Sequence, residues 1–382
     1  MIHKQNILII SQESFFGNML SKHHYAIELS RLGYHVYFLE KPSQERNLER
    51  GKWNIQSTNY SNLFVVKLRL SIPLIFFDNN KFFYTKYIKY KIRQLQNKLH
   101  GFYTVINFDS MDYFPLRFFD KPSTTKIFFP VDQLSILNYK NTSKDCHAVI
   151  TVAKEITYHK FVKSIPMRYF NHGVEENFLN KPYKSLNYSN IQRKSVALSG
   201  NLHQTGLNRN LLKVLILEYI SIDFHFFGVF EPSEHDTQES ISFIDFLRTR
   251  GNVKLRGCLN KEELSFALSE IDFGLVCYNI HDFEYRSWNS HKFLEYLALG
   301  MPVLSTYLSF YKDIDAEDKF FMTRKSLDDN EDFKKYFAYI LNNLKSLQKY
   351  DLFMSRRNFA MKFNYKLLTK ELLNEIEGLR SK

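Results

Sequence analysis

The sequence predicts an α/β protein made of two doubly wound domains. The chain has 382 residues, more than the ~250–300 residues that a single hydrophobic core usually supports. Short apolar segments alternate with helical segments in both halves, and this alternation produces parallel sheets covered by helices. A polar segment at 181–195, poor in large aliphatic residues, is interpreted as the linker between the halves.

The first half opens with a strand–helix–strand unit. Residues 6–11 (NILIIS) are a buried apolar strand, and residues 19–32 place apolar side chains along one side of a helix. Gly33 ends the helix, and residues 35–41 form the next strand. Further strands are expected at 64–69, 104–109, 126–132, 148–153 and 168–174.

The second half repeats the alternation. Strands are predicted at 195–200, 223–228, 252–257, 273–278 and 301–306. Helices are predicted at 210–220, 261–271 and 290–300, and the tail from about 332 is helical. Two such Rossmann-like halves bind ligands at the carboxyl ends of their strands.

Composition excludes several classes of protein. With 44% hydrophobic and 24% charged residues, the chain is globular rather than disordered. Cys146, Cys258 and Cys277 lie far apart and lack metal-ligand spacing, so we expect no disulfide framework, no metal and a reducing, cytoplasmic location. No apolar run has the length of a signal peptide or a membrane span.

The net charge of +12 is concentrated in the first half. Residues 1–183 carry 25 Lys and Arg against 14 Asp and Glu, a net charge of +11, whereas the remainder carries 27 against 26, a net charge of +1. One interpretation is an anionic partner, such as a phospholipid surface, a lipid diphosphate or nucleic acid. The other is a basic surface that keeps the protein in solution.

Residues 81–100 concentrate this charge, with six basic residues, no acidic residue and five aromatic residues. An interfacial helix has this composition, because lysines extend to the headgroups around a buried aromatic side. We expect peripheral contact with the inner face of an anionic membrane through Lys81, Lys86, Lys89, Lys91 and Arg93. The alternative is a core helix with a solvated basic face; nucleic acid is not expected, because no nucleic-acid module is present.

The segment 252–306 carries the most specific motif. It contains a strand ending in Gly257, the pair Glu263-Leu264, Asp272 before a strand, and then Lys292-Phe-Leu-Glu295-Tyr-Leu-Ala-Leu-Gly300-Met-Pro302-Val303. This pattern resembles the donor-binding half of GT-B glycosyltransferases, close to family 4. Residues 172–179 (HGVEENFL) also resemble the segment that ends the first domain of that family.

The resemblance implies a GT-B fold with two Rossmann-like domains facing a cleft. We place the acceptor-binding domain at 1–182 and the donor-binding domain at 183–355. The resemblance also implies that the C-terminal helix, about 356–382, crosses back to the first domain, with Phe363 and Tyr365 as packing residues.

The helix that begins near Ser290 is predicted to bind phosphate. Its first amides are free and its dipole is positive, and Lys292 in the first turn adds a cation that an anionic ligand would stabilise. The resemblance implies that Glu295, one turn later, accepts hydrogen bonds from ribose hydroxyls. The alternative for Lys292 and Glu295 is a solvated helix face.

The segment departs from the family at three positions. Ser287 stands where the family often has a second glutamate, with Glu284 nearby as a substitute. Asn201 and Thr205, after Gly200, stand where the family often has Arg and Lys. The predicted donor-binding residues are Gly200, Asn201, Arg286, Ser287, Ser290, Lys292 and Glu295, with Arg209 as a further candidate for the phosphate charge.

In the first half, the resemblance places the loop containing Phe16, Gly17 and Asn18 on the acceptor side. Asp109 and Asp132 each end a strand, and either an acid–base role or a capping role fits them. His172 is the third catalytic candidate, whereas His23 and His24 are expected at the surface or half-buried.

The resemblance implies transfer of a sugar from a nucleotide-sugar, and we expect a UDP-sugar before a GDP-sugar, with no metal and no cofactor. The expected acceptor is a glycan or lipid-linked saccharide for surface polysaccharide, and the resemblance implies retention of configuration. Two alternatives remain: a nucleotide-sugar epimerase on the same fold, and a non-catalytic protein that binds sugar nucleotide or a partner.

Overall fold

The computed structural model describes residues 5–72, 80–131, 142–157, 165–183, 193–232, 236–314, 319–326 and 329–381. Its contacts divide the chain into two compact units. Unit 1 comprises Met1–Asn171 and Tyr365–Lys382, and unit 2 comprises His172–Asn364. Residues 184–192 of the predicted linker lie outside the described residues.

Unit 1 is built on a sheet with the order β3-β4-β2-β1-β5-β6-β7-β8. Its strands are β1 (Asn6–Ser11), β2 (His35–Glu40), β3 (Trp53–Ser57), β4 (Leu63–Leu68), β5 (Thr104–Asn107), β6 (Thr125–Phe128), β7 (Ala148–Thr151) and β8 (Met167–Tyr169). All neighbouring strands pair in parallel except β3, which is antiparallel to β4. The edge strand β3 is not predicted by the sequence, because its residues are at most half-buried and form no apolar run.

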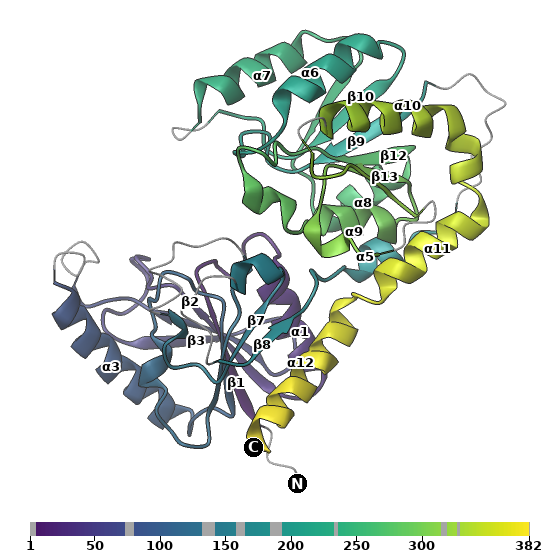
Figure 1. The fold of residues 1–382 in the computed structure, drawn as a ribbon. Coiled ribbons are helices and arrows are strands. Elements are labelled where there is room, and N and C mark those ends of the chain that lie inside the picture. Colours follow the sequence, from purple (N-terminus) through teal and green to yellow (C-terminus); the bar gives the residue numbers. More distant parts are fainter. Residues whose placement is uncertain are drawn as a thin grey trace. The chain divides into compact units, whose positions relative to one another are not determined.

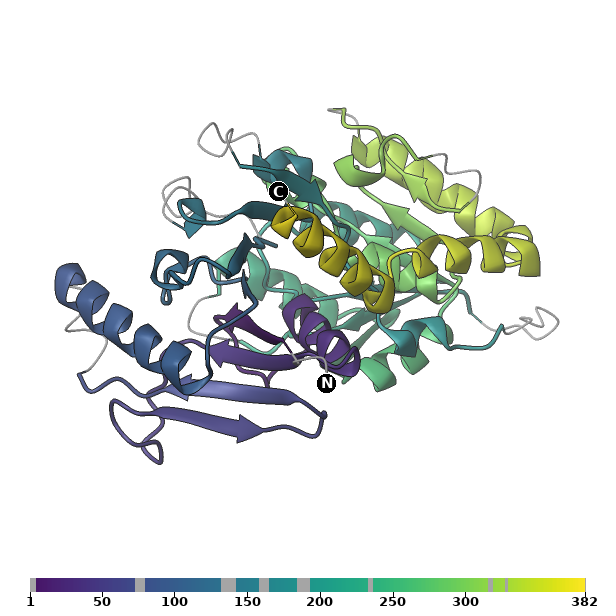
Figure 2. The same cartoon turned by 90° about the horizontal axis from the view of Figure 1, so that it is seen from below.

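Helices cover both faces of the unit 1 sheet (Figure 1). They are α1 (Ser21–Arg31), α3 (Lys81–Lys98) and α12 (Tyr365–Arg380), with short 3-10 turns at Leu116–Phe118 and Lys154–Thr157. Figure 2 shows α3 beside the β3–β4 hairpin, where the Trp53 indole donates a hydrogen bond to the Lys91 carbonyl oxygen (2.9 Å).

The C-terminal helix returns to unit 1. The Tyr365 ring at the start of α12 stacks on His24 of α1 with centroids 4.4 Å apart. Farther along, Glu375 pairs with Arg168 (2.7 Å), and Arg380 donates a hydrogen bond to the Ser123 carbonyl oxygen (2.6 Å). These contacts confirm that the last helix of the chain returns to the first domain. The returning helix begins at Tyr365 instead of at about 356, because residues up to Asn364 pack in unit 2.

Unit 2 is built on a fully parallel sheet with the order β11-β10-β9-β12-β13-β14. Its strands are β9 (Ser195–Ser199), β10 (Asp223–Phe227), β11 (Val253–Gly257), β12 (Phe273–Val276), β13 (Val303–Ser305) and β14 (Phe321–Met322). Its helices are α5 (Glu176–Leu179), α6 (Arg209–Glu218), α7 (Gln238–Arg248), α8 (Lys261–Ser269), α9 (His291–Ala298), α10 (Asp329–Leu347) and α11 (Tyr350–Met361), with 3-10 turns at Glu284–Ser287 and Ser309–Tyr311.

Alternation along the strands builds two hydrophobic cores in unit 2. On β9, Val196 and Leu198 face the core formed with α6, α7 and α10, whereas Ala197 faces the core formed with α8 and α9. Figure 1 shows these two helix layers on opposite faces of the sheet. The doubly wound prediction is therefore confirmed for this unit.

A fully buried arginine holds α11 against the rest of unit 2. Arg356 donates hydrogen bonds to the carbonyl oxygens of Lys319 (3.0 Å), Gly300 (3.2 Å) and Leu347 (2.6 Å). Gly300 ends α9 with φ 71°, and a side chain there would collide with the Phe353 ring. The guanidinium thus joins the ends of α9 and α10 to α11.

The structure corrects one residue of the predicted membrane helix. Lys91 is buried, because its ammonium group donates to the Gly51 carbonyl oxygen and to Gln94 (3.1 Å). Lys81, Lys86, Lys89 and Arg93 are exposed, and Arg93 lies 3.7 Å from Asp120. Among the described residues, none of the helices is both long and apolar enough to span a membrane.

We expect Arg356→Met to destabilise unit 2 strongly. The substitution removes the shared donor of three carbonyl oxygens, of which those of Gly300 and Leu347 are buried, and each unsatisfied buried group costs about 1–3 kcal/mol. Urea unfolding followed by circular dichroism measures the effect. Lys362→Met, which removes a charge from an exposed position after α11, is the matched control; equal stability of the two variants would contradict this role for Arg356.

Candidate functional site

Glycines follow the ends of three neighbouring strands in unit 2. Gly200 after β9, Gly228 after β10 and Gly257 at the end of β11 have φ values of 132°, 138° and 73°. The Gly200 amide donates to the Phe227 carbonyl oxygen (2.7 Å), and the Gly228 amide donates to the Gly257 carbonyl oxygen (2.8 Å). A side-chain carbon at Gly228 would collide with the Gly200 carbonyl group, so the backbones approach as closely as only glycine permits.

The start of α9 lies against Gly200. We call the strand ends at Gly200, Gly228 and Gly257 the glycine edge. Ser290 is the N-cap residue and is buried. The aliphatic end and ammonium group of Lys292 lie where a side chain at Gly200 would project, and the ammonium group donates to the Tyr278 hydroxyl (3.2 Å). The structure thus brings together three predicted residues, Gly200, Ser290 and Lys292.

Tyr296 sets the position of the glycine edge. Its ring lies directly over Gly274 of β12, which has no side chain to obstruct it. The Ser199 amide donates to the Tyr296 hydroxyl (2.8 Å), which also lies 3.1 Å from the Ser199 hydroxyl. Because Ser199 precedes Gly200, this buried phenol holds the end of β9 relative to α9.

The Lys292 charge shifts the pKa of neighbouring groups. Burial and then Lys292 lower the pKa of His172 to about 4, so its ring is neutral at physiological pH. The His172 ring lies 5.8 Å from that of His291, at the start of α9. Burial raises the pKa of the Tyr278 phenol, but Lys292, Ser290 and Arg286 outweigh burial and lower it overall. An anion at this position would meet a cation and polarised donors.

Glu295 lies in the second turn of α9 with a side chain that is 7% exposed. Its Oε1 atom pairs with the Lys261 ammonium group (2.6 Å), which also lies 3.5 Å from Glu175. Burial opposes the charge on Lys261, but the two carboxylates raise the pKa of that lysine. The pairing holds one oxygen of Glu295 in place.

The loop after Gly200 is held by two arginines. Arg209, the further candidate for the phosphate charge, is buried and donates to the carbonyl oxygens of Leu202 (3.1 Å) and Gln204 (3.0 Å), so its guanidinium supports the loop. Arg286 donates to the Thr205 carbonyl oxygen (3.0 Å) and packs against Gly206. The Arg286 guanidinium also lies over the Tyr278 ring, 5.8 Å from its centroid, so its charge is close to the hydroxyl that Lys292 contacts.

Three other predicted residues have local partners. Asn201 is exposed and accepts a hydrogen bond from the His203 amide (2.9 Å). The buried Ser287 hydroxyl donates to the Glu284 carbonyl oxygen (2.7 Å). The Glu284 side chain points to Lys325 and forms an exposed ion pair (2.6 Å).

In unit 1, the loop after β1 exposes Phe16 and is anchored at its base. The Phe16 side chain is 58% exposed, and Gly17 and Asn18 are also exposed. His23 is expected at the surface or half-buried, but it is fully buried, stacks on Phe38 and contacts the Ser14 carbonyl oxygen (3.1 Å), so its ring supports the base of this loop.

The Asp109 carboxylate accepts hydrogen bonds from the backbone of the turn that follows it. Its Oδ1 atom accepts from the Met111 amide (2.8 Å) and its Oδ2 atom accepts from the Tyr113 amide (2.7 Å). Burial raises the pKa of this carboxyl group to about 6 in spite of these hydrogen bonds. The arrangement fits the predicted capping role. Asp132 lies outside the described residues.

For metal ions, the described part of the chain contains no group of three or more His, Cys, Asp or Glu side chains arranged as ligands. The sequence has an Asp-x-Asp pair at Asp313 and Asp315, of which Asp315 lies outside the described residues.

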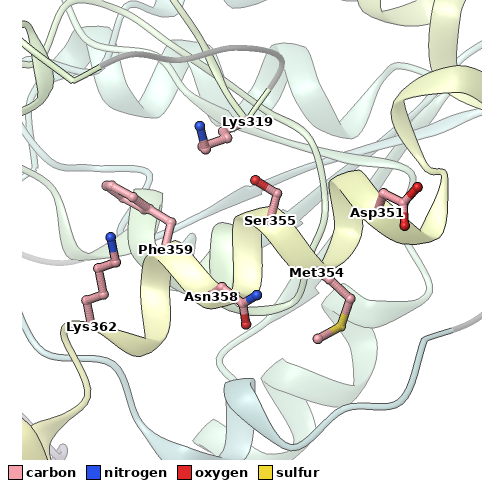
Figure 3. Close-up of a pocket in the computed structure, with 7 residues that line it drawn as sticks. All are labelled: Lys319, Asp351, Met354, Ser355, Asn358, Phe359 and Lys362. Atoms are coloured by element: carbon pink, nitrogen blue, oxygen red, sulfur yellow. The ribbon is translucent and has the colours of Figure 1, made fainter.

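A cavity of about 440 Å³ lies along α11. Figure 3 shows Lys319 across the pocket from the helix. Its lining residues are Lys319, Asp351, Met354, Ser355, Asn358, Phe359 and Lys362, none of which belongs to the predicted site.

Sequence reasoning missed Tyr278, Tyr296, Gly228 and Lys261. Tyr296 belongs to the quoted motif, and Gly228 follows a strand as Gly200 does, so both carried a local signal. Tyr278 and Lys261 carried none, because their partners Lys292 and Glu295 are distant in sequence.

No family model and no curated protein sequence matches the chain. Solved structures do match it over nearly their whole length. Sucrose-phosphate synthase from Thermosynechococcus elongatus is 12% identical with a TM-score of 0.73, and 99% of each chain is covered. HepE from Anabaena, determined in complex with UDP and glucose, is 10% identical with a TM-score of 0.67, and the match covers 98% of this chain and 99% of that one.

WaaG, a glycosyltransferase involved in lipopolysaccharide biosynthesis, is 13% identical with a TM-score of 0.61, and the match covers 97% of this chain and 100% of that one. Likeness at such low identity establishes architecture and leaves activity open. With its two Rossmann-like units and its returning C-terminal helix, the chain has the GT-B fold of these proteins.

Proposed function

We propose that the protein is a glycosyltransferase that moves a sugar from a nucleotide-sugar to a glycan or lipid-linked saccharide acceptor. The observation that carries the proposal is the position of Lys292. Its ammonium group lies at the glycine edge and at the start of α9, and it forms no ion pair with a carboxylate of the described residues. A cation is unfavourable at a helix N-terminus unless an anion accompanies it.

The chemistry of the transfer explains why this arrangement would matter. The bond between the sugar and the diphosphate breaks, and negative charge accumulates on the departing diphosphate. Preorganised donors at that point lower the barrier. In our proposal, the departing diphosphate contacts the Lys292 ammonium group and the first amides of α9. Gly200 has no side chain, so the diphosphate can approach its backbone, and Arg286 lies nearby. We propose that the transfer needs no metal.

Glu295 is proposed to bind the ribose. Lys261 engages Oε1 of its carboxylate, and a carboxylate has a second oxygen with further acceptor capacity. The ion pair would fix the orientation of the side chain, so a ribose hydroxyl would meet a preorganised acceptor. Its position in the second turn of α9 is one turn beyond the diphosphate donors.

For the donor we favour a UDP-sugar over a GDP-sugar. HepE of the same fold was determined with UDP-glucose, and WaaG acts in lipopolysaccharide biosynthesis, which supports a role in surface polysaccharide. Retention of configuration rests on the resemblance of residues 252–303 to family 4. Neutral His172 beside Lys292 is our candidate for a group that contacts the reacting sugar.

We also propose that unit 1 docks on an anionic membrane through the exposed part of α3. Phe82 and Phe83 are 65% and 58% exposed, and Lys81, Lys86 and Lys89 are exposed on the same helix. Aromatic side chains insert at the headgroup level while lysines attract anionic lipid. The position would bring the enzyme to a lipid-linked acceptor at the inner face of the membrane.

A non-catalytic sugar-nucleotide-binding protein is the second candidate. Asn201 and Thr205 favour it, because neutral side chains stand where the family often has cations. Transfer of radiolabelled sugar from UDP-sugar to a membrane extract separates the candidates. Label in the lipid or glycan fraction supports the transferase, whereas UDP binding without transfer supports the binding protein.

We expect Lys292→Gln to weaken UDP binding by about 1.5–3 kcal/mol, because hydrogen bonds to charged groups contribute this much. Isothermal titration calorimetry measures the change. Lys254→Gln, at an exposed position on β11, removes the same charge from unit 2 and should leave the affinity unchanged. UDP affinity that is the same in Lys292→Gln and wild type would refute the diphosphate assignment.

We expect Glu295→Ala to weaken UDP binding by a similar ~1.5–3 kcal/mol through loss of the ribose contact. A 2′,3′-dideoxy analogue of UDP is the control ligand, since it has no ribose hydroxyls to lose. If the substitution weakens both ligands equally, Glu295 acts only by holding Lys261 and the ribose assignment is wrong.

For the membrane surface, we expect Lys86→Gln/Lys89→Gln to weaken binding to anionic liposomes by about 2 kcal/mol, or roughly 30-fold, because each basic residue contributes about 1 kcal/mol. Phe82→Ser/Phe83→Ser should weaken binding to anionic liposomes as well. Co-sedimentation across a salt series provides the measurement.

The charge control for this experiment is Lys335→Gln/Lys345→Gln, which removes two exposed lysines from α10 of unit 2. Binding that is independent of lipid charge, or that falls equally in the control, would show that α3 is an ordinary solvated helix.

A further inference from the structure

A basic pocket of about 400 Å³ lies in unit 1, at the sheet edge where β2 and β4 end. Arg46, Arg50 and Arg69 line it together with Ser43 and Ser71. Because β2 and β4 are parallel, their carboxyl ends meet at one edge, which is where open α/β sheets bind ligands. None of these residues belongs to the donor site described above.

The pocket is held by backbone contacts. The Ser43 amide donates to the Leu68 carbonyl oxygen (2.8 Å), and the Gly51 amide donates to the Arg69 carbonyl oxygen (2.7 Å). These bonds place the segments around Ser43 and Arg50 beside Arg69, with which both form isolated bridges. The pocket is therefore preorganised, which reduces the entropy lost on binding.

Arg69 organises the loop in addition to lining the pocket. Its Nη1 atom donates to the carbonyl oxygens of Arg46 and Leu48, both at 2.8 Å. Gly51, with φ 70°, approaches Ser71 so closely that a side-chain carbon would collide with the Ser71 hydroxyl. The guanidinium and the glycine together fold the loop over the end of β4.

The positive charge of the pocket is not neutralised by its neighbours. The two acidic residues of the loop pair elsewhere, Glu45 with Lys67 (2.7 Å) and Glu49 with Lys52 (2.6 Å). No described carboxylate forms an ion pair with Arg46, Arg50 or Arg69. Three like charges around one cavity repel one another unless an anion joins them.

The side chains indicate which anion fits. One guanidinium group can donate two parallel hydrogen bonds to two oxygens of a phosphate. The Ser43 and Ser71 hydroxyls add neutral donors. Leu70 and Ile72 supply an apolar wall, and Ile72 is 40% exposed. The Ser71 hydroxyl is within 3.1 Å of the hydroxyl of Tyr87 on α3, so the pocket adjoins the helix proposed to contact the membrane.

We infer that this pocket binds a phosphate or diphosphate ester, and specifically one attached to an apolar chain, as the carrier end of the acceptor. The inference rests on the proposed transferase function for its biological role, but not for the binding itself. The arginines hold the phosphate oxygens, and Leu70 and Ile72 contact the first carbons of the chain.

The test measures binding of inorganic pyrophosphate and of farnesyl diphosphate to the full chain by calorimetry, with saturating UDP present to occupy the donor site. We expect Arg46→Gln/Arg50→Gln to weaken both probes at least tenfold. Lys366→Gln/Lys370→Gln removes two exposed charges from α12 of the same unit and should change either affinity less than twofold. Arg46→Lys/Arg50→Lys should weaken binding less than the glutamine pair.

The two probes separate the sources of phosphate. Farnesyl diphosphate binding at least tenfold tighter than pyrophosphate, and selectively weakened by Ile72→Ser, supports a lipid-borne ester. Equal affinity of the two probes overturns the apolar carrier and leaves a free phosphate or diphosphate as the ligand. If each probe binds Arg46→Gln/Arg50→Gln with the same affinity as the wild type, the pocket is not the phosphate site.

The proposed function fails in a different way. If UDP does not bind at all, the donor assignment is wrong, and the arginine variant still reports on this pocket. Thermal unfolding of Arg46→Gln/Arg50→Gln should match the wild type, because both side chains are exposed, so a loss of binding is not a loss of folding.

Discussion

The candidate donor site of unit 2 depends on the absence of side chains at Gly200 and Gly228. A side chain at Gly228 would collide with the Gly200 carbonyl group, and a side chain at Gly200 would displace Lys292. The two strand ends can therefore meet, and the α9 cation can rest on them, only where both residues are glycine. Tyr296, one turn farther along α9, lies over Gly274, and its hydroxyl accepts a hydrogen bond from the Ser199 amide at the same strand end.

Electrostatics builds on this geometry. His172 beside Lys292 is neutral at physiological pH, since burial and Lys292 lower its pKa to about 4. The nearby carboxylate of Glu295 pairs with Lys261, which Glu175 also approaches, and not with Lys292. A positive charge that its own surroundings do not offset favours an anionic ligand, and burial makes the interaction stronger than it would be in water.

Unit 1 distributes its positive charge differently. Part of the excess positive charge stabilises the fold. The Lys91 ammonium group, for example, donates a hydrogen bond to the Gly51 carbonyl oxygen. Another part gathers in the arginine pocket, and a third part lies on α3 beside exposed Phe82 and Phe83. The pocket and the helix are connected through Ser71 and Tyr87, so the two anionic contacts that we propose would involve one continuous region of this unit.

Local patterns in the sequence were enough to predict the two doubly wound domains and the start of α9, because strand and helix periodicity and the segment from Ser290 to Pro302 can be recognised without tertiary contacts. It did not reveal the edge strand β3, whose half-buried residues form no apolar run. Four further features became visible only in the folded chain: Glu295 pairs with Lys261, Arg209 supports a loop, Lys91 is buried, and three arginines share a pocket. Each of these depends on contacts between separate segments, and a side chain's partners across such distances leave no trace in local periodicity.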